Sequence, residues 1–304
     1  METVSPLQVE HIVLPLDGSR LAEAALPAGV ALAQRFGARV TLLHVLERHP
    51  PATIHGERHL TSVGEAAAYL HGISSRFADR HIAFESHVHP VPEGDVPASI
   101  GQHVEELGAD LVVLCTHGQS GIRGWFSGSI AQRVVRRTTP PTLLVRPSRS
   151  SQSEFHPRTV VVALDGTVEG EAALPAALAL ALAFDAPMSL FYAVATLGTV
   201  PGDRAAAARL SPSATAAALD LEQATAVEYV EGLVDRLRQL GATAQGEVGR
   251  GGAAETLITA SERFPESVVA LATHGRAGFD SLWSGSVGSK VVTKAAGPLL
   301  LVHP

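Results

Sequence analysis

The chain is poor in the features that mark several large classes of protein. A single cysteine, Cys115, among 304 residues excludes an internal disulfide framework. The formal net charge of −7 leaves no excess of basic residues for a nucleic-acid interface, so we expect no nucleic-acid partner. The longest apolar run, Ala172–Phe184, is too short to cross a bilayer, so no membrane span is expected. The first ten residues lack a basic segment followed by an apolar one, which favours a cytoplasmic protein.

What the chain does have is an internal repeat. Residues 11–45 align without a gap on residues 159–193, with LDG on LDG and AALP on AALP, at an offset of 148 (165 − 17). Near the end of each half, THG matches THG and PTLLVRP matches PLLLVHP at an offset of 157 (275 − 118), so the second half gains nine residues in its middle. The sequence predicts a first domain over residues 1–147, a linker rich in Ser, Pro and Arg over 148–158, and a second domain over 159–304.

Each half shows the alternation that is typical of a parallel sheet. Short runs rich in Val and Leu alternate with longer Ala-rich segments, as strands do with crossover helices. Right-handed crossovers and burial on both faces predict two α/β domains, each a doubly wound three-layer sandwich with a five-stranded parallel sheet. The expected strands of the first half are His11–Leu16, Arg39–Val45, His81–His89, Leu111–Cys115 and Pro141–Arg146. Those of the second half are Thr159–Leu164, Pro187–Val194, Thr243–Val248, Ser267–Ala272 and Pro298–Val302.

A glycine-rich loop follows the fourth expected strand of each half, at the end of the strand where doubly wound sheets bind ligands. The glycine of a THG triplet, Gly118 or Gly275, is followed by nine residues and then by a Gly-Ser pair. These pairs, Gly128-Ser129 and Gly285-Ser286, precede apolar segments of helical period, so backbone N–H groups and a hydroxyl can surround a phosphate. The alternative is a duplicated helix cap that binds nothing.

An Asp-Gly pair follows the first expected strand of each half. Asp17 and Asp165 are therefore candidates for the same site as the glycine loops. The alternative is a turn-forming Asp before Gly, which is common in turns of this kind. The twin placement in the two halves favours the site.

These motifs resemble the nucleotide-binding branch of the universal stress protein family, and the chain is similar to a tandem of two such domains over nearly all of both halves. That branch carries G-x-x-G, nine residues and then G-[ST], together with an Asp after the first strand. In this chain Cys115 and Ala272 stand where the motif has its first Gly. A Cβ at this position narrows the space in which the backbone approaches the ligand, and Ala is the milder change.

The resemblance implies ATP as the cofactor, with Mg²⁺ or Mn²⁺ bound only through the triphosphate. It implies a strand order of 3-2-1-4-5 in each half and a pseudo-two-fold axis that relates the halves as an intramolecular pseudo-dimer, with a homodimer as a further possible assembly. The site positions that it implies in the first half are Pro15, Asp17, Val45, Cys115, His117, Gly118, Gly128, Ser129 and Ile130. In the second half they are Asp165, Ala193, Ala272, His274, Gly275, Gly285, Ser286 and Val287.

The expected function is ATP binding in stress-response signalling, with no or only slow ATP hydrolysis. Hydrolysis needs a group that positions water, a metal ligand and a cation. Arg123 and Arg276 occupy different loop positions, so the halves share no catalytic constellation. Two alternatives stay open: a nucleotide-free scaffold that acts through protein contacts, and an adenine-nucleotide hydrolase of related fold. We expect both pockets to be competent, with unequal affinity.

Two further groups of residues raise questions of metal and redox chemistry. His55 and His59 have the i,i+4 separation of helical zinc ligands, but Gly56 and the neighbouring prolines favour a loop, and the second half has no counterpart. We therefore expect no metal ligand among them. Cys115 ends a buried strand and is expected to be a small core residue, with a redox role as the alternative.

Overall fold

The computed structural model describes residues 4–116, 130–147, 154–200, 202–273, 290–291, 294–295 and 297–304. The chain divides into two compact units, one of residues 8–156 and the other of residues 157–304 together with the segment before Gln8. That segment belongs with the second unit, in which the Leu7 N–H donates a hydrogen bond to the Pro175 carbonyl at 3.0 Å. The sequence had assigned this segment to the first domain.

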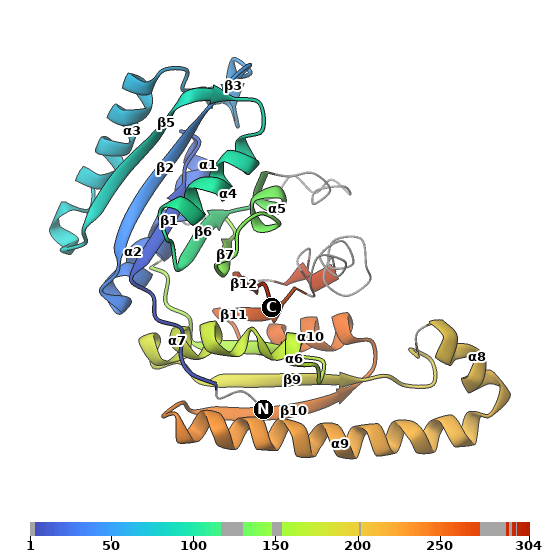
Figure 1. The fold of residues 1–304 in the computed structure, drawn as a ribbon. Coiled ribbons are helices and arrows are strands. Elements are labelled where there is room, and N and C mark those ends of the chain that lie inside the picture. Colours follow the sequence, from blue (N-terminus) through green and yellow to red (C-terminus); the bar gives the residue numbers. More distant parts are fainter. Residues whose placement is uncertain are drawn as a thin grey trace. The chain divides into compact units, whose positions relative to one another are not determined.

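A parallel sheet forms the centre of the first unit (Figure 1). Across the sheet the strands follow the order β5-β2-β1-β6-β7, which is 3-2-1-4-5 when its strands are numbered along the chain. All of the neighbouring pairs in this order run parallel. The strands are β1 (His11–Pro15), β2 (Arg39–Glu47), β5 (Phe84–Glu93), β6 (Leu111–Cys115) and β7 (Thr142–Val145).

The second unit repeats this sheet. Its order is β10-β9-β8-β11-β12, and the neighbouring strands again run parallel. The strands are β8 (Thr159–Leu164), β9 (Met188–Val194), β10 (Ala244–Arg250), β11 (Ser267–Ala272) and β12 (Leu299–Val302). The predicted fold class, two α/β domains built on parallel sheets, is therefore confirmed.

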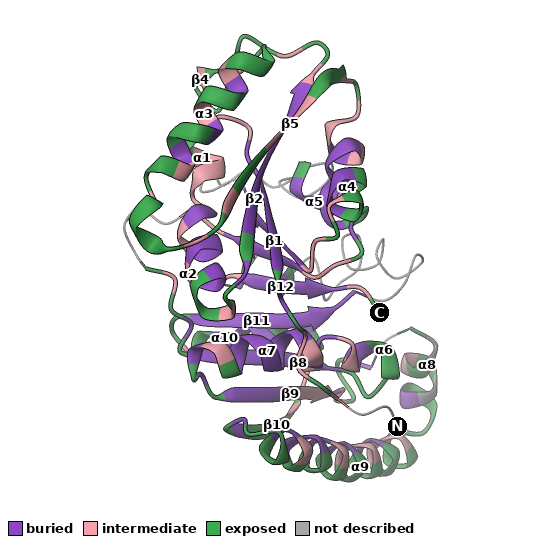
Figure 2. Ribbon diagram, turned by 60° about the vertical axis from the view of Figure 1, so that its left-hand side comes forward, coloured by how far each residue is buried: buried purple, intermediate pink, exposed green. Residues whose placement is uncertain are grey.

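Helices cover both faces of each sheet, as crossover connections between parallel strands require. In the first unit α2 and α3 lie on one face and α4 and α5 on the other (Figure 2). The first unit contains α1 (Arg20–Glu23), α2 (Leu26–Phe36), α3 (Val63–Ser75), the 3-10 turn Ala78–Arg80, α4 (Val96–Glu106) and α5 (Ile130–Val135). The second contains α6 (Val168–Glu171), α7 (Leu174–Phe184), α8 (Gly202–Leu210), α9 (Pro212–Gln239) and α10 (Ala253–Glu262). Among the described helices, none combines the length and the apolar character that a membrane span needs.

Two local predictions are corrected by the structure. The third strand of the first half was expected over His81–His89, but it runs over Phe84–Glu93, because His81 takes a left-handed φ of 55° at the end of the preceding turn. The segment around His55 was expected to be a loop, and it contains a short antiparallel hairpin of β3 (Thr53–Ile54) and β4 (Glu57–Arg58). His55 and Gly56 have φ values of 51° and 85°, and positive φ at both central residues is typical of a tight two-residue hairpin turn.

The additional residues of the second half lie before the part of α9 that matches α3. The two helices bury corresponding residues at an offset of 160 (226 − 66), so this segment of the second half is 12 residues longer than the offset of 148 would give. The net gain at the THG triplets is nine, because the segment between α9 and the triplet is three residues shorter (160 − 157) than its counterpart in the first half. The corresponding buried residues are Ala66, Leu70 and Ile73 in α3 and Ala226, Val230 and Leu233 in α9. Helix α9 starts at Pro212, whereas the start of α3 at Val63 corresponds to position 223. The second unit has thus gained three further helical turns at this place.

Candidate functional site

The expected site residues that the structure describes lie at or near the carboxyl edges of the two sheets. Strand β1 lies between β2 and β6, so the topology brings the segment after β1 together with the ends of both neighbours. In the first unit Pro15 ends β1, Asp17 follows it, Val45 lies in β2, Cys115 ends β6 and Ile130 begins α5. In the second unit Asp165 follows β8, Ala193 lies in β9 and Ala272 ends β11. His117, Gly118, Gly128, Ser129, His274, Gly275, Gly285, Ser286 and Val287 lie outside the described residues.

Asp17 and Asp165 shape the turn that links the first strand of each unit to the following helix. Asp17 Oδ1 accepts hydrogen bonds from the Ser19 N–H at 2.8 Å and from the Ser19 hydroxyl at 2.6 Å. Asp165 Oδ1 accepts the same two bonds from Thr167, at 3.0 Å and 2.6 Å. Each hydroxyl oxygen then accepts a bond from a backbone N–H in the first turn of the next helix, α1 or α6. The turn-forming role, which the sequence left open as an alternative, is present in both units.

The two turns differ in their exposure to solvent. In the first unit Asp17 and Gly18 are half-buried and Ser19 has no exposed surface. In the second unit Asp165, Gly166 and Thr167 are all exposed. The two turns have the same hydrogen bonds, but the turn of the first unit is covered and the turn of the second unit is open to solvent.

The hairpin of β3 and β4, together with Leu60, covers the turn of the first unit. Leu60 packs so closely on Gly18 that an added Cβ there would lie 2.8 Å from the Leu60 Cδ1 atom. His55 Nε2 lies 3.7 Å from Asp17 Oδ2. The hairpin and Leu60 together therefore contact both residues of the Asp-Gly pair, which is a candidate site in the sequence.

The histidine in the hairpin turn, His55, and the one just after the hairpin, His59, lie near different carboxylates. His55 faces Asp17, whereas the buried His59 places its Nε2 3.4 Å from Glu47 Oε2 at the end of β2. The two rings do not share a helix face as helical zinc ligands would, because the segment between them is a hairpin. Within the described residues, no group of three or more His, Cys, Asp or Glu side chains could hold a metal ion.

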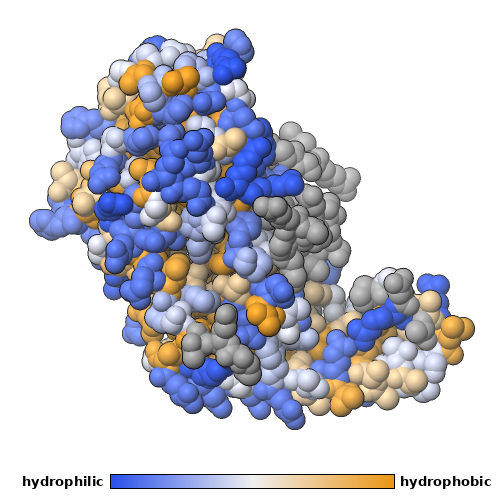
Figure 3. All heavy atoms as spheres, in the orientation of Figure 1, coloured by the Kyte–Doolittle hydropathy of each residue, from blue (hydrophilic) through white to orange (hydrophobic). Residues whose placement is uncertain are grey.

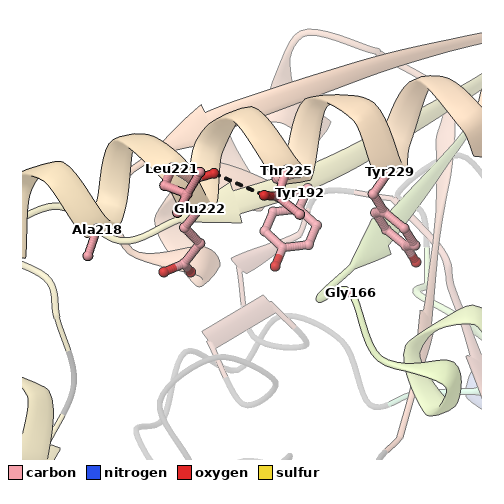
Figure 4. A pocket seen from close by; sticks show the side chains of 8 residues that line it. Gly166, Tyr192, Ala218, Leu221, Glu222, Thr225 and Tyr229 are labelled. Carbon is pink, nitrogen blue, oxygen red and sulfur yellow. Dashed lines mark hydrogen bonds between the residues drawn. The ribbon is translucent and has the colours of Figure 1, made fainter.

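A cavity of about 420 Å³ lies in the second unit between α9 and the end of β8 (Figure 4). The side chains of Tyr192, Glu222 and Tyr229 point from β9 and α9 toward the side on which Gly166 lies. The rings of Tyr192 and Tyr229 meet edge to face, with centroids 6.1 Å apart. Leu221 and Thr225 complete the α9 side of the wall. A largely apolar hollow of this volume with a few polar groups is typical of a small-molecule site.

The position of Tyr192 is held by His44 in the first unit, at the offset of 148 (192 − 44). His44 is buried, and its Nδ1 donates a hydrogen bond to the Leu16 carbonyl at 2.7 Å. Its Nε2 has no hydrogen-bond partner among the described residues. Burial lowers the pKa of His44, although the Leu16 carbonyl and the Asp17 carboxylate act in the opposite direction. The first unit therefore has a neutral, inward-facing imidazole where the second has a tyrosine at a cavity.

A cluster of Tyr, Glu and Arg, which is not among the site residues predicted from the sequence, is duplicated beside the two turns. In the sequence, the cluster is indicated by a Tyr followed seven residues later by an Arg in each half, and the two Tyr-Arg pairs are 160 residues apart (229 − 69). The carboxylate of Glu23 accepts from the Tyr69 hydroxyl at 3.4 Å and from Arg76 at 2.6 Å. Glu171 accepts from the Tyr229 hydroxyl at 3.0 Å and lies 3.8 Å from Arg236. Burial and the adjacent glutamate raise the pKa of both tyrosines, so both hydroxyls stay protonated and can donate. The cluster ties α3 to α1 and α9 to α6, which fixes the helix behind each turn.

Cys115 lies near the Asp17 turn as a protonated thiol. Burial, with a smaller contribution from the Asp17 carboxylate, raises the pKa of Cys115 to about 12. The thiol donates to the Thr116 carbonyl at 3.3 Å. Because the thiolate is the reactive form, these surroundings disfavour the redox alternative.

Comparison with known proteins decides the family. The model of the universal stress protein family matches residues 8–146 and, a second time, residues 157–303. The chain belongs to the universal stress protein family. Because the two matches cover both halves, it is a tandem member with two such domains in one chain, as the sequence predicted.

Relatives of known sequence or structure agree with this assignment. A universal stress protein of Methanocaldococcus jannaschii is 28% identical over 140 residues, which are 45% of this chain and 82% of that protein. A universal stress protein of Mycolicibacterium smegmatis is 31% identical over 140 residues, 45% of each chain. Among solved structures, a universal stress protein from Archaeoglobus fulgidus matches 98% of this chain and 97% of its own, with a TM-score of 0.69 and 14% identity. At this level of identity the structural likeness shows the fold alone.

Proposed function

We propose that this universal stress protein binds ATP and acts in stress-response signalling, with no or only slow ATP hydrolysis. The observation that carries the proposal is the exposed turn of Asp165, Gly166 and Thr167 beside the cavity under α9. The turn and the cavity lie at the carboxyl edge of a doubly wound sheet, which is where such sheets bind ligands.

The residues of the second unit fit a nucleotide. Ala193 is half-buried in β9, next to Tyr192 of the cavity, and would offer backbone groups to adenine. The glycine loop that runs from Gly275 to Ser286 in the sequence would supply N–H groups to the phosphates. Mg²⁺ or Mn²⁺ would then be bound through the triphosphate. The cavity volume is within the range of sites that bind small molecules.

Slow or absent hydrolysis follows from the groups that the turn provides. The carboxylate of Asp165 accepts two hydrogen bonds from Thr167 and is held in the turn, which makes it a poor general base. The halves share no Arg position in their glycine loops that could stabilise the transferred phosphoryl group.

The first experiment is mass spectrometry of any ligand released from the purified protein, followed by calorimetric titration with ATP and Mg²⁺. If backbone N–H groups hold the phosphates, Gly285→Val abolishes binding in the second unit, whereas Ser286→Ala weakens it by roughly 0.5–1.5 kcal/mol. A melting curve of each variant shows that it is folded. A folded Gly285→Val protein that binds ATP as the wild type does would remove this loop from the site.

A second function, a scaffold that acts through protein contacts, is favoured by the covered turn of the first unit, which leaves less room for a nucleotide there. Exposed apolar side chains in the second unit offer a contact surface for such a role, since Leu210 is 88% exposed and Leu221 is 70% exposed. Figure 3 shows hydrophobic and hydrophilic residues side by side over α8 and the first part of α9. Sedimentation of the purified chain would show whether it also forms the predicted homodimer. The pseudo-two-fold relation of the two halves stays a prediction.

A further inference from the structure

We propose that each chain binds a single nucleotide. Its base occupies the cavity under α9 in the second unit, while the hairpin of β3 and β4, with Leu60, fills the corresponding position in the first. The inference rests on the ATP binding proposed above, and it replaces the expectation of two competent pockets.

One part of the cavity wall is helical only in the second unit. Leu221 and Glu222 belong to the three helical turns by which α9 exceeds α3. Their counterparts at the offset of 160 are Thr61 and the helix cap Ser62, which precede α3. The first unit therefore has no helix at the place of Leu221 and Glu222, although α3 matches the part of the wall that Thr225 and Tyr229 form.

The lining of the cavity suits a flat aromatic base that carries an amino group. Tyr192 lies against Gly166, where an added Cβ would meet its ring and hydroxyl at 3.1 Å, so glycine allows the ring to lie at the turn. Glu222, which is held by Arg204 at 2.9 Å, provides carboxylate oxygens that accept from an amino group. The Thr225 hydroxyl donates to the Leu221 carbonyl and so keeps an oxygen lone pair as a second acceptor (Figure 4).

In the first unit, the protein's own side chains make the contacts at the corresponding place. Leu60 packs on Gly18, the counterpart of Gly166, and His55 faces Asp17, the counterpart of Asp165. A hydrogen bond also holds the hairpin to the start of α1, since the backbone N–H of Arg20 donates to the Glu57 carboxylate at 2.5 Å. A base can enter here only if the hairpin leaves.

Calorimetric titration of the full chain with ATP and Mg²⁺ tests the cavity. The wild type is expected to bind one ATP per chain, and Thr225→Trp, which fills the cavity from an exposed helix position, is expected to bind none. The matched control is Ala224→Trp, on the neighbouring exposed position that does not line the cavity, and it should bind as the wild type does. Wild-type binding that survives Thr225→Trp would overturn the inference.

Removal of the hairpin tests the closure of the first unit. Residues 53–58 can be replaced by two glycines, because Ala52 and His59 already lie together, with the His59 N–H donating to the Ala52 carbonyl at 3.3 Å. Because Leu60 also packs on Gly18, the shortened chain carries Leu60→Ala as well. It should bind two ATP, and one when Thr225→Trp is added. Leu60→Ala alone is a milder second variant, in which weak binding at the first unit should appear. A folded shortened chain that still binds one ATP would refute the closure.

The outcomes separate this inference from the function on which it rests. Two ATP per wild-type chain would leave ATP binding intact and refute the single site. No ATP bound by the wild type or by the shortened chain would remove the proposed function itself.

Discussion

The duplicated turn allows a measurement in which one unit is the control for the other. Ser19 and Thr167 make the same two kinds of bond: each hydroxyl donates to an aspartate and accepts from a backbone N–H of the next helix. Ser19 has no exposed surface, so after Ser19→Ala water cannot replace the lost partner of the N–H. Loss of a helix cap lowers the free energy of unfolding by about 0.5–2 kcal/mol. We expect Ser19→Ala to lower it by about 2 kcal/mol, at the upper end of this range. Thr167 is exposed, so Thr167→Ala should cost roughly 0.5 kcal/mol.

Thermal unfolding followed by circular dichroism would measure the difference. At about 2–4 °C per kcal/mol for a domain of this size, Ser19→Ala lowers the melting temperature by roughly 4–8 °C and Thr167→Ala by about 1–2 °C. Hydrogen exchange at α1 and α6 assigns each change to its unit. Ser19→Thr and Thr167→Ser keep the hydroxyl and are the controls. Equal losses from the two alanine variants would show that the hairpin does not shield the first turn, and would refute the reasoning.

Three further predictions concern single residues. The pKa of His44 is lowered by burial, so the folded state resists the proton that the unfolded chain takes up near pH 6.5. The contribution of His44 to the free energy of unfolding is therefore complete above that pH and falls as the pH is lowered. In urea unfolding at pH 5–7, His44→Gln should reduce the dependence of the unfolding free energy on pH by up to about one proton. Cys115, with its pKa raised to about 12, should react with iodoacetamide at pH 8 far more slowly than a free thiol, and labelling at the free-thiol rate would contradict its burial. At Gly246→Ala the new Cβ would overlap Val230 of α9, so the variant should lose about 1–3 kcal/mol in urea unfolding, whereas an unchanged midpoint would mean that α9 moves freely on β10.

The order of the elements was readable from the sequence because it depends on local patterns. Short Val- and Leu-rich runs gave the strands to within about four residues at each end, since a strand buried on both faces leaves a nearly continuous apolar run. The repeat gave the division into two domains. The Asp-Gly turns were open to the sequence as the alternative to a ligand site, because the hydrogen bonds of such a turn join residues only two positions apart.

The state of each candidate site depended on contacts between distant parts of the chain. Gly18 and Leu60 are 42 residues apart, and nothing in the local sequence of either indicates that one covers the other. Tyr192 and Tyr229 meet only because β9 and α9 pack together. Packing also decides that the additional residues of the second half form helical turns beside a cavity. The sequence by itself determined the family and the duplication, since these follow from short-range patterns. Only the tertiary structure decided that one turn is covered and the other is open, because burial is a property of side chains that the fold brings together from separate segments.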